Sequence, residues 1–148
     1  AGALKIGALT GGANEEQAQH LYDFGRNMGI AFQLKDDLLD VFGSPETFGK
    51  QVGGDILACK KTFLYLKATQ LADDLTKSTL ENYYTNKDCS IKKVKVVKDI
   101  FQSLNIEKHT VEIIKSYYIK ATKHLEVISS KNKEILFLFS KKLMERVS

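Results

Sequence analysis

The chain has 148 residues, of which 43% are hydrophobic, 27% charged and 9% aromatic, enough for one domain that buries roughly two-thirds of its unfolded surface. This composition excludes an extensively disordered chain, and no apolar run approaches the ~18 residues of a membrane-spanning helix, which excludes a transmembrane protein. Charge is uneven, because residues 1–49 hold 3 basic and 7 acidic residues whereas residues 50–148 hold 19 and 11.

The start of the chain and its cysteines indicate a cellular context. Ala1 lies inside an apolar, small-residue stretch without the basic segment of a secretory signal, so we expect the chain to be part of a longer polypeptide. Cys59 and Cys89 are too few for a disulfide framework and lack metal-ligand spacing. We therefore expect reduced thiols in a cytoplasmic protein.

The apolar pattern predicts one helix after another. Residues 1–10 are typical of a helix end that stops at Gly11 and Gly12, and Asn14 followed by acidic residues predicts the start of a long helix reaching Phe42. A glycine-rich loop is expected over 48–55, and further helices are expected at 60–72, 78–84, 91–104, 106–128 and 135–147. No alternating β-branched stretch competes, so the predicted fold class is all-α, in a single domain over 1–148.

Basic residues and histidines give weaker signals. We interpret the lysine cluster as the solvated side of a helix; it comprises Lys92, Lys93, Lys95 and Lys98. The chain also has only two arginines, the residues that bind phosphates and base edges with two hydrogen bonds at once. We therefore expect no nucleic-acid partner. His20, His109 and His124 share no metal-ligand spacing and are expected at the surface or its boundary. The acidic pair Asp73-Asp74 is expected to face solvent, and the apolar block 135–139 to be covered.

The strongest local feature is the acidic run Asp36-Asp37-Leu38-Leu39-Asp40. On a helix, Asp36 and Asp40 lie one turn apart on one face, with Asp37 turned by about 100°. Carboxylates this close repel, and near the C-terminal end of an apolar helix the dipole opposes them too. Hard oxygen ligands at this spacing suit Mg²⁺. Lys50 follows within the glycine-rich loop, and Lys60 and Lys61 follow beyond it. The pattern indicates a binding site for a magnesium-bound diphosphate. The alternative is that these aspartates form an exposed acidic face of the helix.

These motifs resemble a known family. The run from Gly29 to Gly43, then Phe48-Gly49-Lys50-Gln51-Val52-Gly53-Gly54-Asp55, then Lys60-Lys61-Thr62, resembles the second aspartate-rich region and the following blocks of trans-type isoprenyl diphosphate synthases (the polyprenyl synthetase family). The resemblance covers essentially the whole chain but about the C-terminal half of a family member. It implies the C-terminal part of an isoprenoid synthase helical bundle. It also implies a prenyltransferase that condenses an allylic prenyl diphosphate head-to-tail with isopentenyl diphosphate and releases pyrophosphate.

The same resemblance implies roles for individual residues. Asp36, Asp37 and Asp40 would be catalytic and bind Mg²⁺, directly or through water. Lys50 and Lys60 would hold the allylic diphosphate and stabilise it as a leaving group. Gln33 would bind substrate at the allylic site, and Phe32 would line the substrate cavity, the alternative for Phe32 being a packed core aromatic. The full-length protein would be a homodimer.

Two other functions were considered, and the chain differs from the family pattern in one respect. A class I terpene cyclase would need Ser or Thr at position 40 and Glu at position 44, where the chain has Asp40 and Ser44. A non-catalytic helical subunit of a synthase would be expected to have lost site residues that are present here. The family's first aspartate-rich motif and its isopentenyl diphosphate residues have no match in this chain, so we expect it to be inactive alone.

Overall fold

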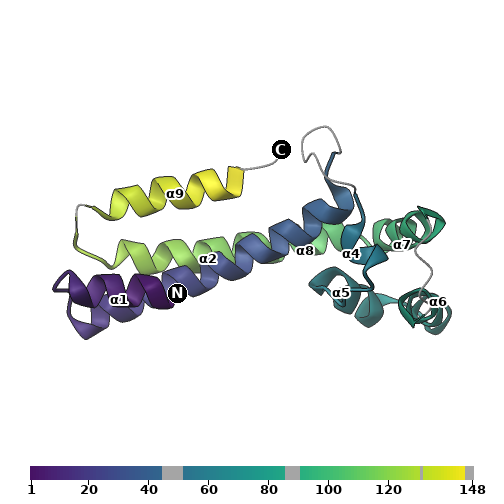
Figure 1. The fold of residues 1–148 in the computed structure, drawn as a ribbon, viewed down its shortest axis with the longest axis horizontal. Helices are drawn as coiled ribbons and strands as arrows, with labels where there is room; N and C mark the ends of the chain where they lie inside the picture. The colour runs from purple at the N-terminus through teal and green to yellow at the C-terminus, as the bar shows by residue number, and fades with distance from the viewer. Residues whose placement is uncertain (45–51, 86–90, 131, 146–148) are drawn as a thin grey trace. The chain divides into compact units, whose positions relative to one another are not determined.

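The computed structural model describes residues 1–44, 52–85, 91–130 and 132–145, and all regular elements in these ranges are helices (Figure 1). The helices are α1 (Gly2–Thr10), α2 (Glu15–Phe42), α4 (Gly54–Leu57), α5 (Phe63–Leu71), α6 (Asp74–Thr85), α7 (Ile91–Ser103), α8 (Ile106–Glu126) and α9 (Lys133–Glu145). The all-α prediction is therefore confirmed. Within the described ranges, no helix is long and apolar enough to cross a membrane.

The junction between α1 and α2 forms as the sequence predicts. Gly12 has a φ of +84°, the left-handed conformation that glycine adopts without a steric penalty. The side-chain oxygen of Asn14 accepts a hydrogen bond of 2.8 Å from the backbone N–H of Gln17 and so caps α2. Glu15 and Glu16 occupy the first turn of α2, where the helix dipole favours negative charge.

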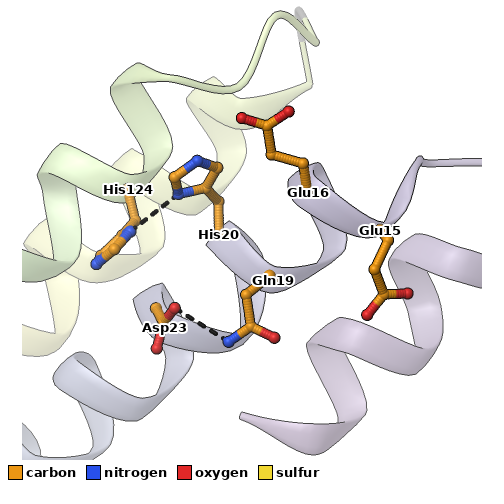
Figure 2. Close-up of a pocket in the computed structure, with 6 residues that line it drawn as sticks. All are labelled: Glu15, Glu16, Gln19, His20, Asp23 and His124. Atoms are coloured by element: carbon orange, nitrogen blue, oxygen red, sulfur yellow. Dashed lines mark hydrogen bonds between the residues drawn. The ribbon is translucent and has the colours of Figure 1, made fainter.

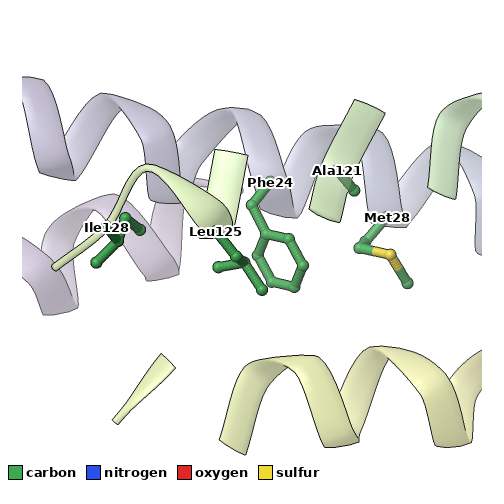
Figure 3. Close-up of a cluster of buried hydrophobic side chains, with 5 residues drawn as sticks. All are labelled: Phe24, Met28, Ala121, Leu125 and Ile128. Carbon is green, nitrogen blue, oxygen red and sulfur yellow. The ribbon is translucent and has the colours of Figure 1, made fainter. Parts of the chain in front are cut away.

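One compact unit comprises residues 1–33 and 113–146. Its core joins α2 to α8 and the residues just after α8, through the buried side chains of Phe24, Met28, Ala121, Leu125 and Ile128 (Figure 3). Apolar side chains of α1 and α9 pack against this cluster: Leu4, Leu136, Phe137, Leu143 and Met144. A Cβ on Gly25 would lie 2.7 Å from the side chain of Leu4, so this glycine permits the close approach of α1.

The second unit comprises residues 34–112, in which α7 contacts α4, α5 and α6. Its core includes the fully or almost fully buried side chains of Ile56, Leu64, Leu80, Val97, Phe101 and Ile106. Gly53, just before α4, has a φ of +86°, and a Cβ there would lie 2.4 Å from the side chain of Val94 in α7. This position therefore needs glycine for both conformation and space.

Several element predictions need correction. The glycine-rich segment is not all loop, because Gly54–Leu57 form the short helix α4. The helix expected to open at Ser78 begins at Asp74, since the carboxylate of Asp73 accepts a 2.7 Å hydrogen bond from the N–H of Thr76 and caps α6 one turn earlier. Asp73 and Asp74 are exposed as expected.

Two surface predictions were also wrong in part. Lys93 is fully buried, with its ammonium group donating to the sulfur of Cys59 at 2.8 Å, so the lysine cluster of α7 is not simply a solvated face. In the apolar block 135–139, Leu136 and Phe137 pack on the core, but Ile135, Leu138 and Phe139 remain exposed.

Candidate functional site

The acidic run lies in the last part of α2, within the unit 34–112. Asp36 is exposed, whereas Asp37 and Asp40 are half-buried. Asp37 and Asp40 are three residues apart and are therefore neighbours on one helix face. The structure thus separates the run into one carboxylate in solvent and two that meet other parts of the unit.

Asp40 holds the beginning of α4. Its carboxylate accepts a 2.9 Å hydrogen bond from the backbone N–H of Asp55, and its backbone carbonyl accepts one of 2.6 Å from the N–H of Gly53. A Cβ on Gly54 would approach the Asp40 carboxylate to 3.1 Å, so glycine leaves room for this contact. Because backbone N–H groups at a helix start need acceptors, Asp40 fixes the glycine turn against α2.

Lys60 reaches the same place from the segment between α4 and α5. Its ammonium group lies 2.5 Å from the carboxylate of Asp55, and its side chain is 63% exposed whereas that of Asp55 is 16% exposed. The hydrogen bond and negative charge of Asp55 raise the pKa of Lys60. Asp55 therefore keeps the lysine charged and directs it beside the aspartates of α2 while its outer surface stays open to solvent.

The half-buried aspartates resist ionisation. Burial and then the charge of Asp55 raise the pKa of Asp37, with a smaller contribution from Asp36, against the opposing effects of the Phe63 backbone amide and Lys60. Burial also raises the pKa of Asp40, although the backbone amides of Asp55 and Gly54 favour its charged form. The carboxylates are thus gathered at a cost that a bound cation would offset.

The donor set fits a hard divalent cation only in part. In the ranges that the structure describes, no three His, Cys, Asp or Glu side chains converge on one metal position. Asp36 and Asp37 present carboxylate oxygens, the ligands that Mg²⁺ prefers, while Asp40 is engaged by α4. A Mg²⁺ ion held here would take its other ligands from water or from a bound diphosphate, as this ion commonly does.

The other predicted site residues are Phe32, Gln33 and Lys50. Phe32 and Gln33 are exposed residues of α2 in the unit 1–33 and 113–146, and Phe32, at 37% exposure, is not a core aromatic. Lys50 lies outside the described residues. Sequence reasoning assigned no role to Asp55, although its position directly after two glycines was a signal that its carboxylate follows a tight turn.

Sequence reasoning also gave no reason to pair two histidines that the fold brings together. The Nδ1 atoms of His20 and His124 lie 3.0 Å apart within the unit 1–33 and 113–146. Both rings are half-buried, as expected for residues at the surface boundary.

Comparisons with known proteins identify the chain's family. The family model for polyprenyl synthetase matches residues 1–104. A geranylgeranyl diphosphate synthase of Sulfolobus acidocaldarius is 34% identical over 127 residues, covering 86% of this chain and 38% of the relative. The chain thus spans less than half the length of the curated relative.

Solved structures show the same fold. A crystal structure of a geranylgeranyl pyrophosphate synthase matches 99% of this chain and 46% of its own, with a TM-score of 0.85 and 40% identity. A geranylgeranyl pyrophosphate synthase from Corynebacterium glutamicum, complexed with isoprenyl diphosphate and magnesium, matches 91% of this chain and 39% of its own, with a TM-score of 0.81 and 26% identity. On these matches, and on the isoprenoid synthase fold that they share, the chain belongs to the polyprenyl synthetase family.

Proposed function

We propose that this chain is part of a prenyltransferase that condenses an allylic prenyl diphosphate head-to-tail with isopentenyl diphosphate and releases pyrophosphate. The observation that carries the proposal is the gathering of Asp37, Asp40, Asp55 and Lys60 beside the exposed Asp36 in a chain of the polyprenyl synthetase family. Relatives named as geranylgeranyl and farnesyl diphosphate synthases support it.

The aspartates and Lys60 have different roles in the release of the diphosphate. Asp36 and Asp37 would hold Mg²⁺, which would supply positive charge for the departing diphosphate, and Asp40 keeps the glycine turn and α4 in place. Lys60, directed by Asp55, donates hydrogen bonds to the diphosphate. Negative charge on the leaving group grows as the allylic bond breaks, so a fixed ammonium group stabilises this state more than the bound substrate.

Further features belong to the same proposal. The chain forms the C-terminal half of the synthase domain, and Lys50, Gln33 and Phe32 contribute to the allylic substrate site. The full-length protein is a cytoplasmic homodimer that uses Mg²⁺. The magnesium-bound crystal structure of the Corynebacterium glutamicum relative supports the choice of metal.

The test is a condensation assay on a full-length protein that contains this chain. Labelled isopentenyl diphosphate, an allylic diphosphate and MgCl₂ should give a longer prenyl diphosphate and one pyrophosphate per condensation, and chelation of the metal should stop the reaction. The isolated 148-residue chain, as a control, should give no turnover. Failure of the full-length protein to elongate any allylic diphosphate would contradict the proposal.

A further inference from the structure

A second polar site lies in the unit 1–33 and 113–146, away from the aspartate run in sequence. An open pocket of about 350 Å³ lies between the first turns of α2 and the last turn of α8, and Figure 2 shows the residues that line it. It is lined by Glu15, Glu16, Gln19, His20, Asp23 and His124. The proposed prenyltransferase function assigns none of these residues a role.

The two imidazole rings face each other through the same kind of atom. Their Nδ1 atoms are 3.0 Å apart and their ring centroids 5.4 Å apart, at an interplanar angle of 44°. Without a metal, one ring donates its Nδ1 proton to the lone pair of the other. Two histidine nitrogens bound to one metal ion at about 2.0–2.1 Å lie roughly 3 Å apart. The pair therefore has nearly the spacing of two ligands of one ion. To bind an ion, the donating ring must move its proton to Nε2 and both rings must turn so that their Nδ1 lone pairs point at the same position.

The charges around the pair favour a cation. Glu16 precedes His20 by four residues and Asp23 follows it by three, so both carboxylates neighbour it on the surface of α2. Asp23 is oriented by a 3.1 Å hydrogen bond from the side-chain amide of Gln19. Lys5 compensates Glu15 through a 2.6 Å ion pair, and His124 lies in the last turn of α8, where the helix dipole favours positive charge.

We propose that His20 and His124 form a binding site for a divalent transition-metal ion of the zinc class. Imidazole nitrogen suits zinc and its neighbours, whereas Mg²⁺ prefers oxygen ligands, so this site is chemically distinct from the aspartate run. Because no third ligand among the described residues converges on the pair as it stands, water and a rotated side chain of Asp23 or Glu16 complete the coordination. The ion links α2 to α8, whose residues are 104 apart in sequence, and stabilises the folded unit.

Calorimetric titration with ZnCl₂ at neutral pH, without any diphosphate, tests this site independently of the proposed catalytic function. The wild-type protein should bind one zinc ion saturably, and its melting temperature should rise with zinc and fall back after EDTA is added. His20→Gln and His124→Gln should each weaken zinc binding at least tenfold. MgCl₂ should not compete for the site.

The third histidine provides the matched control. His109 is also half-buried on α8 but lies outside the pocket, so His109→Gln should bind zinc as the wild type does. Addition of CoCl₂ should give visible absorption bands in the wild type and in His109→Gln, but not in His20→Gln. Circular dichroism of each variant shows whether it is folded, and Asp23→Asn, which keeps both rings, should weaken binding less than either ring substitution.

The outcomes separate the alternatives. Absence of saturable zinc binding to the wild-type protein would overturn the proposal. Zinc binding that survives both ring substitutions would overturn it as well, because the ion would then sit on the cysteines or on the aspartate run.

Discussion

The two ends of α2 carry similar numbers of acidic residues but face opposite physical conditions. At the N-terminal end, Glu15 and Glu16 follow the Asn14 cap and are favoured by the helix dipole, and Glu15 pairs with Lys5. Towards the C-terminal end the dipole opposes negative charge, and burial raises the pKa of Asp37 and Asp40. The first group stabilises the helix. In the second group the half-buried carboxylates cost stability when they are ionised, as expected of residues kept for binding, although the hydrogen bond that Asp40 accepts from Asp55 anchors α4.

The largest expected difference between the two ends of α2 is in the effect of a substitution on catalytic activity. In the full-length protein, Asp36→Ala should lower kcat/KM for condensation by about 10²- to 10³-fold, because a group that stabilises transition-state charge is lost. Asp74→Ala, which removes another exposed aspartate, should leave kcat/KM unchanged and is the matched control. A loss of less than tenfold for Asp36→Ala would count against its metal role.

The anchoring role of Asp40 predicts a smaller effect, on stability. Asp40→Ala removes the acceptor of the Asp55 N–H and should lower the free energy of unfolding by about 1–2 kcal/mol. Asp40→Asn keeps an oxygen acceptor at this position and removes the half-buried charge whose desolvation raises the pKa of Asp40, so it should be at least as stable as the wild type near neutral pH. Denaturant titration of both variants measures the difference, and equal losses would show that the hydrogen bond is not what Asp40 contributes.

At the other end of the helix, the cap should affect stability alone. Asn14→Ala should lower the free energy of unfolding by about 1 kcal/mol, since the N–H of Gln17 loses its acceptor. Asn14→Asp keeps an acceptor and should be close to wild type. Condensation by the full-length protein should be unaffected in both variants, and a large loss of activity in either would break the contrast between the two ends of α2.

The smallest expected effect concerns a single charge. Glu16→Gln should lower the free energy of unfolding by about 0.3–1 kcal/mol at low salt, because a favourable charge leaves the first turn of α2. The measurement, made in EDTA so that bound metal does not contribute, should show the effect shrinking as salt is added. A stabilising substitution would contradict the dipole argument.

The sequence predicted the helical architecture well where its signals were local. The Asn14 cap, the apolar period of α2 and the positions of α7 and α8 follow from spacing and capping within a few residues. The beginning of α6 was missed because Asp73 and Ser78 both offer capping side chains, and the structure uses Asp73. The burial of Lys93 depends on Cys59 and other residues distant in sequence, so helix periodicity could not reveal it.

The candidate site was also predictable only where its signals were local in sequence. Asp36, Asp37, Asp40 and Lys60 stand out by type and spacing, and the structure associates three of them with Asp55. Asp55 acts through a turn whose geometry depends on Gly53 packing against Val94, a contact between residues far apart in sequence. The His20–His124 pair is likewise created by the packing of α2 on α8, which no local pattern records.

Asp37 gives the most direct test of the claim that the acidic run serves binding at the expense of stability. An acid whose pKa is raised by folding destabilises the native state when ionised, so Asp37→Asn should raise the free energy of unfolding near neutral pH. The same variant of the full-length protein should bind an allylic diphosphate in MgCl₂ at least tenfold more weakly by calorimetry. A variant that is less stable than the wild type, and binds the Mg²⁺-diphosphate equally well, would contradict the account.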